Sequence, residues 1–507
     1  MEEDRKEMKK LHRLASSQQP HGPTSVEEVT DEVWLLTKLA FLLIRCMGAG
    51  SEWIIRCTRL AIFSLILLPC FLRHFWFYFT SSHILKNVSY GRNSRNSLDL
   101  YIPFRRHQSD DSPKKWPVLI CFSGGAWIIG YKAWSGLVGK MMMEHGILLV
   151  TPDYRNFPQG LVSDMLEDYN AAIRWVFQNI DAYGGDVDNI YIMGQSAGAH
   201  LSALALIDNA ERQLFLHPSN GDSHLHLPHS WRVSDVKAYI GVSGVYDLPK
   251  ATAHIHDRGL YKSVLFSIME GELSLHSPSL RVERMKRRWQ SRRALQRMQQ
   301  KDERSEGAND EEEWKKLAEE FPRVVLIHGK KDKTIPWVAS QGFAEALHLA
   351  GLGNGKAEEQ QPLLVKYYND KTHTDAIVED VFLGRNEVLW DVIDIILGQS
   401  PDEEENMLPE VSVDKAADKG LLRSLSLLMV VWGWAMLVAL YKVLVKSLLR
   451  GEKEKEKEEK AAEKEEMERG LRKGELRRRE RRHKLTARNQ RGYPLFLIQL
   501  AKRMNPF

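Results

Sequence analysis

Cysteine is scarce in this chain, with four among 507 residues. Three lie in apolar N-terminal segments and one lies in a predicted core strand: Cys46, Cys57, Cys70 and Cys121. Their spacing matches neither a zinc module nor the disulfide framework of a small secreted protein. We therefore expect a catalytic domain that faces the reducing cytosol and binds no metal.

Excess charge of one sign is also missing, because the formal net charge is only +4. A value this small gives no reason to expect nucleic acid as a partner. The chain does not open on a hydrophobic leader, since residues 1–32 are polar and of mixed charge. We expect these residues to be disordered and expect no signal peptide.

Two regions contain long apolar runs. The first, residues 33–79, includes a segment at 33–45 whose internal charges favour a helix lying in the membrane interface. It also includes Leu60–Phe79, which has roughly the 20-residue length of a membrane span, and which Pro69 should kink. The second candidate, residues 421–449, has an uncharged centre. We expect membrane attachment; the alternative for Leu60–Phe79 is a helix buried against a soluble domain.

Residues 80–400 alternate short apolar runs with helix-length segments, such as 164–179. This pattern predicts an α/β fold, with a mostly parallel sheet covered by helices on both faces. The predicted strands are Leu98–Ile102, Val118–Phe122, Ile147–Val150, Tyr191–Met193, Lys237–Val242, Val324–Ile327 and Leu363–Tyr368. We expect a cap at about 250–275 and a solvated, partly disordered charged insertion at about 281–316. The later segments are expected to be an acidic linker, a candidate transmembrane helix and a charged helical tail: 401–420, 421–449 and 450–507.

The motif GQSAGAH, Gly194–His200, follows an apolar run and precedes a helical Ala/Leu segment. A serine at the apex of a strand–turn–helix unit is typical of a nucleophile elbow, and the two glycines leave room for the sharp turn. Ser196 is therefore the predicted nucleophile. The amide of Ala197, at the start of the helix, is expected to bind an oxyanion. The plainer alternative is a glycine turn with an incidental serine.

A serine hydroxyl needs a base to take its proton and an acid to orient that base. On this kind of sheet the acid and then the histidine follow the serine, on loops after later strands. Asp332 and His373 occupy those places. Asp247 is a rival acid, whereas two aspartates close to the histidine fit less well: Asp370 and Asp375.

The second half of an oxyanion site is expected on the loop after an earlier strand. Ser123 to Trp127 provides consecutive glycines there, so backbone amides can approach a ligand closely. The residues favour Gly125 or Ala126 as donor, and the alternative is an ordinary glycine turn.

Other histidines lack the partners that a metal site would need. Four of them crowd one stretch without acidic or cysteine partners at metal-ligand spacing: His217, His224, His226 and His229. His254 and His256 could line the mouth of the pocket. We predict no metal site and no cofactor.

Several motifs together resemble the isoprenylcysteine α-carbonyl methylesterases, a family best known from plants. The resemblance covers about residues 31–396 and includes these strings: GGAWIIGYKAW (124–134), DYRNFPQG (153–160), YGGD (183–186), GQSAGAH (194–200), RGLY (258–261), SIMEGE (267–272) and KTHTD (371–375). It implies an α/β-hydrolase of endoplasmic reticulum and Golgi membranes that demethylates the carboxyl-terminal prenylcysteine of lipidated proteins. It also implies a triad of Ser196, Asp332 and His373, with membrane lipid as a further partner. The residues that it places at the substrate carbonyl are Gly124, Gly125, Ala126, Gln195, Ser196 and Ala197.

The chain departs from this family pattern in three places. Ser123 stands where many related esterases have histidine, the insertion at 281–316 is longer than expected, and residues from about 400 onward lie outside the resemblance. Two other functions stay open at this point. One is a membrane-bound carboxylesterase or lipase acting on other lipid or small esters, and the other is a non-enzymatic membrane-tethered scaffold.

Membrane topology is harder to predict. A single crossing by residues 421–449, with the following basic residues in the cytosol, would put the catalytic domain in the lumen, away from prenylated proteins. We expect a cytosolic catalytic domain, so either that segment does not cross or the charge rule fails. Asn87-Val88-Ser89 is a glycosylation acceptor only if it is luminal.

Overall fold

The computed structural model describes residues 51–104, 115–215, 231–299, 309–355, 363–398 and 495–504. Several expectations lie outside the described residues: the disordered N-terminus, the interfacial segment, the four crowded histidines, the acidic linker, the second membrane candidate and most of the charged tail. These are residues 1–32, 33–45, 217–229, 401–420, 421–449 and 450–494.

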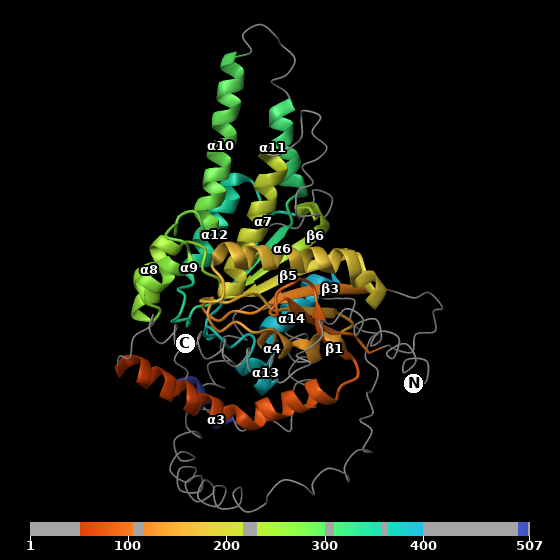
Figure 1. The fold of residues 1–507 in the computed structure, drawn as a ribbon, viewed down its shortest axis with the longest axis vertical. Coiled ribbons are helices and arrows are strands. Elements are labelled where there is room, and N and C mark those ends of the chain that lie inside the picture. Colours follow the sequence, from red (N-terminus) through yellow and green to blue (C-terminus); the bar gives the residue numbers. More distant parts are fainter. Residues whose placement is uncertain are drawn as a thin grey trace, which may run out of the picture. The chain divides into compact units, whose positions relative to one another are not determined.

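Within the described residues, the centre of the fold is an eight-stranded sheet with the order β1-β2-β4-β3-β5-β6-β7-β8 (Figure 1). The strands are β1 (Ile84–Ser89), β2 (Ser97–Tyr101), β3 (Trp116–Phe122), β4 (Leu148–Pro152), β5 (Gly185–Gln195), β6 (Val236–Val242), β7 (Arg323–Gly329) and β8 (Leu364–Tyr368). Strand β2 pairs antiparallel with both β1 and β4. In the spatial order of the sheet, every pair from β4 through β3 to β8 is parallel. The mostly parallel sheet agrees with the prediction, but β1 was not predicted.

Continuous apolar runs arise because both faces of the sheet are covered. In β3, Val118 and Ile120 contribute to one buried cluster while Leu119 and Cys121 contribute to the other. The described helices are α3 (Ser51–Thr80), α4 (Lys132–Gly136), α5 (Gly139–Glu144), α6 (Val162–Asn179), α7 (Ala197–Phe215), α8 (Leu248–Asp257), α9 (Lys262–Ile268), α10 (Pro278–Gln299), α11 (Asn309–Glu320), α12 (Val338–Ala350), α13 (Glu379–Leu383), α14 (Glu387–Leu397) and α17 (Leu495–Met504). The first cluster takes side chains from α6 through α12, and the second from α3, α5, α13, α14 and α17. The predicted cap region contains α8 and α9.

The charged segment at 281–316 is predicted to be a solvated, partly disordered insertion, and the structure describes its residues 281–299 and 309–316. Within the described residues it forms most of α10 and α11, which run side by side in Figure 1. The buried residues Val282, Met285 and Trp289 recur at helical spacing on α10. The ring of Trp289 lies 5.1 Å from that of Trp314 on α11. A narrow apolar stripe in a highly charged sequence therefore suffices to pack the two helices.

Of the predicted charged helical tail, the structure describes one helix, α17, near the end of the chain. Helix α17 belongs to the same compact unit as the described residues up to Leu397. Helix α17 packs against α3 and α13, and its Ile498 and Ala501 are fully buried in the second cluster. The apolar start of α17 and its two buried positions hold it on the catalytic unit.

Candidate active site

Ser196 lies between the end of β5 and the start of α7, at a very sharp turn. Its φ of 55° lies in the left-handed region, which residues with a side chain rarely adopt. Its backbone amide donates to the carbonyl of Val242 over 2.9 Å. A Cβ at Gly194 would lie 2.4 Å from the carbonyl oxygen of Gly198, and a Cβ at Gly198 would lie 2.5 Å from that of Phe122. Both glycines are therefore required for a strained turn of the kind that holds a nucleophile.

The structure brings Ser196, His373 and Asp332 together from three loops. Nε2 of His373 lies 2.9 Å from Oγ of Ser196, and Nδ1 of the same ring lies 2.7 Å from Oδ2 of Asp332. Because a carboxylate only accepts hydrogen bonds, we assign the ring proton to Nδ1, and Nε2 then accepts from the serine hydroxyl. In this tautomer the imidazole is ready to take the serine proton.

Asp332 is buried, and four donors surround its carboxylate. Oδ1 accepts from the amides of Thr334 and Ile335 over 2.8 and 2.9 Å. Oδ2 accepts from His373 and lies 3.2 Å from Nε2 of His328. Burial raises the pKa of this carboxyl, but its electrostatic interaction with His373 and hydrogen bonds from both histidines hold that pKa well below its usual range. Asp332 therefore stays ionised, and it can orient His373.

The loop after β3 lies directly against the nucleophile turn. A Cβ at Gly124 would lie 2.9 Å from Cβ of Ser196, so this contact requires glycine. Gly125 and Ala126 continue with φ values of 123° and 51°. Ala197 begins α7, and an amide in the first helical turn has no acceptor within the helix. The arrangement is suited to two backbone donors on one developing oxyanion.

Gln195 makes a contact that was not foreseen. Its side-chain amide donates to the backbone carbonyl of His373 over 3.1 Å. This side chain therefore connects the nucleophile turn to the loop of the histidine. The family resemblance predicts Gln195 only as a residue at the substrate carbonyl.

Trp127 and His200 were missed as supporting residues. The indole N–H of Trp127 donates to Nδ1 of His200 over 3.2 Å, and Nε2 of His200 lies 2.7 Å from the carbonyl oxygen of His276. Burial lowers the pKa of His200 to about 3, so the ring is neutral and Nε2 carries its proton. The chain of hydrogen bonds links the glycine loop, α7 and the segment after α9. The position of His200 one helical turn after Ser196 was the available signal.

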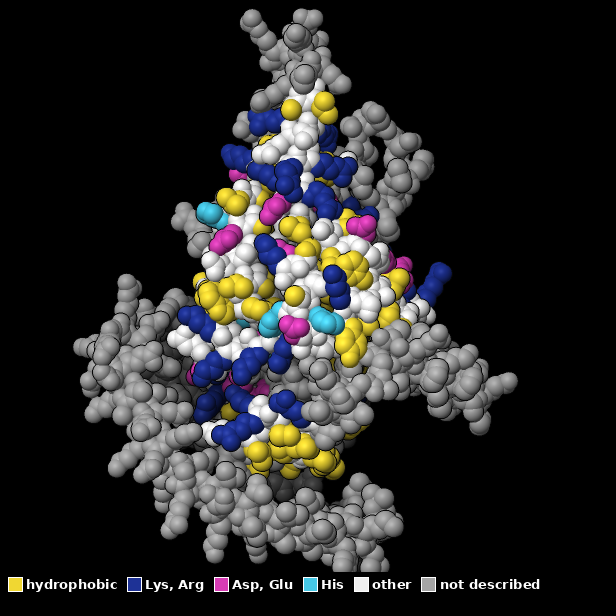
Figure 2. Space-filling model, turned by 90° about the vertical axis from the view of Figure 1, so that its left-hand side faces the viewer, with side chains coloured by type: hydrophobic (Ala, Val, Ile, Leu, Met, Phe, Trp, Pro, Cys, Tyr) yellow, Lys and Arg dark blue, Asp and Glu magenta, His cyan; other side chains and the backbone are white. Residues whose placement is uncertain are grey.

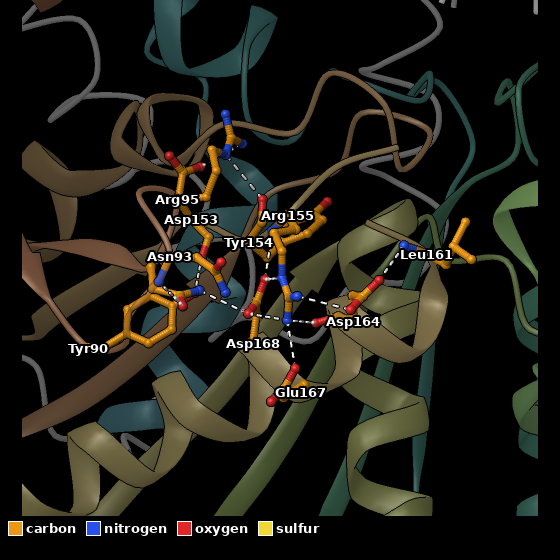
Figure 3. Close-up of polar contacts among 11 residues, drawn as sticks. Tyr90, Asn93, Arg95, Asp153, Tyr154, Arg155, Leu161, Asp164, Glu167 and Asp168 are labelled. Carbon is orange, nitrogen blue, oxygen red and sulfur yellow. Dashed lines mark hydrogen bonds and ion pairs between the residues drawn. The ribbon is translucent and has the colours of Figure 1, made fainter. Parts of the chain in front are cut away.

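Arg155, in the motif Asp153–Gly160, reaches three carboxylates of α6, and Figure 3 shows its guanidinium between them. Its nitrogens lie 2.9 Å from Asp168 and Asp164 and 2.8 Å from Glu167. The hydrogen bonds to Asp168 and the charge of the acidic group raise the pKa of Arg155. These contacts attach the beginning of the motif to the helix.

The same motif supports the glycine loop. The hydroxyl of Tyr154 donates to the carbonyl of Ser123 over 3.0 Å, and the amide of Phe157 donates to the carbonyl of Trp127 over 2.8 Å. The DYRNFPQG string therefore has a structural purpose: it connects α6 to the loop beside Ser196.

The rival acid Asp247 and the two histidines predicted at the pocket mouth make contacts outside the triad. Asp247 is the N-cap of α8, accepts from the amide of Lys250 and pairs with its ammonium. His254 contacts the carbonyl oxygen of Lys333, and His256 accepts from the amide of Lys262. Among the residues that the structure describes, no group of three or more histidine, cysteine or acidic side chains could hold a metal ion.

Known proteins resemble this chain to different degrees. Among solved structures, a propionate-bound esterase from Thermogutta terrifontis covers 61% of this chain and 91% of its own, with a TM-score of 0.39 and 20% identity. The BD-FAE family matches residues 98–347. A probable isoprenylcysteine alpha-carbonyl methylesterase of Oryza sativa subsp. japonica is 40% identical over 385 residues, which are 75% of this chain and 80% of that protein. The isoprenylcysteine alpha-carbonyl methylesterase of Arabidopsis thaliana is 38% identical over 374 residues, which are 73% of this chain and 75% of that protein. With relatives this similar over most of their length, the chain belongs to the isoprenylcysteine alpha-carbonyl methylesterase family.

Proposed function

We propose that this protein removes the methyl ester from the carboxyl-terminal isoprenylcysteine of prenylated proteins. Its family makes it a carboxylic ester hydrolase. The observation that carries the mechanism is the continuous hydrogen-bond chain from Ser196 through His373 to Asp332. The names of the relatives supply the substrate class.

The reaction follows from this geometry. Oγ of Ser196 attacks the ester carbonyl carbon while Nε2 of His373 takes the hydroxyl proton. Backbone amides of the glycine loop and of Ala197 stabilise the oxyanion, and we assign the loop donor to Gly125 or Ala126. The carbon–oxygen bond to methanol then breaks, and methanol leaves with the proton from His373. Water attacks the acyl-enzyme by the same route, which releases the carboxylate and restores the serine.

The experiment compares a farnesylcysteine methyl ester with its unprenylated counterpart. Burying only two methylene-sized groups of the prenyl chain would contribute about 1.6 kcal/mol, or roughly tenfold in kcat/KM. We expect at least that preference for the prenylated ester, and the Ser196→Ala variant should lose turnover of both. Equal kcat/KM for the two esters would instead favour an esterase acting on other lipid or small esters. A cellular function that survives Ser196→Ala would favour the scaffold.

The enzyme is proposed to work at the membranes of the endoplasmic reticulum and Golgi, attached through α3. The segment Ile62–Thr80, with 19 residues, is long and apolar enough to span a membrane by length and composition. Phe63, Leu67 and Phe71 on one side of it are buried against the catalytic unit. A helix on the surface of a soluble protein would carry polar residues on its other side.

The outer side of α3 is apolar instead. Leu65, Trp76 and Phe79 are 67%, 65% and 69% exposed, and the other large apolar side chains exposed along it are Ile62, Leu68, Leu72 and Phe75. Figure 2 shows hydrophobic side chains gathered over this part of the surface, with Lys and Arg side chains beside them. Apolar residues flanked by basic ones suit the boundary between acyl chains and anionic headgroups.

Contacts along the length of α3 favour a helix lying in the plane of the membrane. Near its start, Arg59 donates to the backbone carbonyl of Arg503 over 2.9 Å. In its middle, the ring of Phe71 lies 4.9 Å from that of Phe382. Near its end, Tyr78 is hydrogen-bonded to the catalytic unit. A crossing helix with these contacts would bring the polar catalytic unit into hydrocarbon, which is strongly unfavourable.

The chain path supports a cytosolic catalytic domain. Helix α14, which ends at Leu397, and helix α17, which begins at Leu495, belong to the same compact unit. A single crossing by residues 421–449 would separate α17 from the unit on which it packs. We therefore propose that this segment does not cross once, which removes the conflict with the charge rule.

A further inference from the structure

The loop that carries His373 is held on both sides of the histidine by acidic side chains. Oδ2 of Asp375 accepts from the amide and the hydroxyl of Thr372 over 2.6 and 2.8 Å. On the other side, the hydroxyl of Thr374 donates to Oε1 of Glu379 over 2.9 Å. The position of the His373 backbone, and with it the imidazole, therefore depends on where the carboxyl groups of Asp375 and Glu379 lie.

The second oxygen of Asp375 is paired with a residue from the far end of the chain. Lys502 of α17 forms an ion pair with Oδ1 of Asp375, whose side chain is 0% exposed. The neighbouring cation Lys371 pairs with Asp380 over 2.9 Å and with Glu387 over 3.2 Å. Within the described part of the chain, Lys502 is thus the cation that compensates Asp375.

The ion pair of Lys502 and Asp375 lies beside other acidic groups, in a buried environment that disfavours charge. Burial, and then the charge of Asp375, raises the pKa of Glu379 to about 7. Burial also raises the pKa of Asp380 to about 6, although the charges of Lys371 and Lys502 lower it. An uncompensated carboxylate here would be costly, because a buried charge that loses its partner destabilises its surroundings.

Helix α17 is fixed well enough to position Lys502. Ile498 and Ala501 are fully buried on its inner side. The carbonyl of Arg503, next to Lys502, accepts from Arg59 of α3. The lysine is therefore presented from a packed helix, held between α3 and the loop of His373.

We propose that Lys502 is a positioning residue for His373 that acts through Asp375. With the pair intact, Asp375 stays in place to accept both hydrogen bonds from Thr372. Without the lysine, the carboxylate moves toward water or another donor, and the adjacent imidazole moves with the loop. A displacement of about 1 Å can cost up to 10²-fold in rate. The inference rests on the role proposed above for His373, but not on which ester is the substrate.

The test uses the full-length protein in detergent and a short-chain nitrophenyl ester. Active sites are titrated with a fluorophosphonate, so that kcat is counted per reactive serine. We expect Lys502→Gln to lower kcat about tenfold with KM within twofold, and to slow phosphonylation of Ser196 to a similar extent. Lys502→Arg should restore most of kcat, because it can still pair with Asp375. The matched control is Arg503→Gln, which removes the same charge from the next, exposed position of α17 and should leave kcat within twofold.

A double-mutant cycle separates positioning from general stability. If Lys502 acts through Asp375, Lys502→Gln should change kcat little in an Asp375→Asn background. The double variant contains no unpaired charge from this pair. Its comparison with Asp375→Asn therefore carries the test even if Lys502→Gln alone does not fold. An unchanged per-site kcat in Lys502→Gln, or additive losses in the double variant, would overturn the proposal. If the enzyme showed no preference for the prenylated ester, the proposed substrate would be contradicted. The effect of Lys502→Gln on kcat for the nitrophenyl ester would still test the role of Lys502.

Discussion

Asp99 lies inside the sheet at 0% side-chain exposure and pairs with Lys132, whose Nζ is 2.7 Å away. The same carboxylate accepts a hydrogen bond from Tyr78 of α3 over 2.8 Å. This buried group therefore joins the strand β2, the first residue of α4 and the helix that we propose to lie on the membrane.

We expect Lys132→Met to reduce the free energy of unfolding by about 3–5 kcal/mol, because it leaves the buried carboxylate of Asp99 without its cation. Tyr78→Phe removes only one hydrogen bond to a charged group and should cost about 1.5–3 kcal/mol. Thermal and denaturant unfolding of the purified variants measure both effects. The control is Asp99→Asn combined with Lys132→Met, which should recover part of the loss. A Lys132→Met variant as stable as the wild type would show that the ion pair of Asp99 and Lys132 does not stabilise the fold.

A second prediction concerns Asp332. Asp332→Asn would let Nδ1 of His373 become an acceptor and place the ring proton on Nε2, the wrong tautomer for taking a proton from Ser196. We expect kcat to fall by about 10³–10⁴-fold with little change in the melting temperature. Nitrophenyl ester hydrolysis, counted per titrated serine, gives the value. A fall of less than tenfold would mean that another group orients the imidazole.

The central sheet and the convergence of Ser196, Asp332 and His373 could be predicted because they depend on local patterns and simple topology. Apolar runs such as Val118–Phe122 identify strands covered on both faces, and the carboxyl ends of parallel strands meet at one edge. The sequence order of Ser196, Asp332 and His373 then predicts which loops converge. Their hydrogen-bond distances follow from backbone positions that no short pattern encodes.

Other features were hidden because their signals are long-range or masked by composition. The stripe of Val282, Met285 and Trp289 lies within a segment dominated by arginine and lysine, so charge concealed a packing helix. Lys502 is one basic residue in a tail full of them, and only its contact with Asp375 distinguishes it. His328 follows the apolar residues of a strand, where its role beside Asp332 depends on a side-chain direction.

A third prediction follows from Glu379. Its pKa is raised from 4.5 to about 7 in the folded protein, first by burial and then by the charge of Asp375. A carboxyl group with a raised folded pKa adds stability that is complete below its unfolded pKa and is lost as pH rises through the folded value. We therefore expect Glu379→Gln to gain melting temperature relative to the wild type as pH rises from about 5 to about 8. A difference that is constant over this range would contradict the shifted titration.

A fourth prediction concerns the side of the membrane. Asn87 in Asn87-Val88-Ser89 lies in β1, and its Oδ1 accepts from Lys132 over 2.5 Å. If the catalytic domain faces the cytosol, this acceptor sequence never meets the glycosylation machinery. Endoglycosidase treatment of the protein expressed in eukaryotic cells should leave its gel mobility unchanged. A mobility shift that disappears in Asn87→Gln would place the catalytic domain in the lumen.

The last prediction tests the outer side of α3. Replacing Leu65, Leu72 and Trp76 together with serine removes large exposed apolar side chains without touching those that pack inward. Each contributes roughly 1.5–3 kcal/mol when fully buried, so partial insertion of three should still change the partition coefficient by at least about 100-fold. Flotation of the protein with vesicles containing anionic lipid measures this change.

The matched control replaces Ser64, which is exposed on the same helix, with alanine and should float like the wild type. Because the triad lies elsewhere, the triple variant should hydrolyse a soluble ester normally, while its turnover of a vesicle-bound prenylcysteine ester should fall with its binding. Undiminished flotation would show that α3 is not the membrane-binding surface.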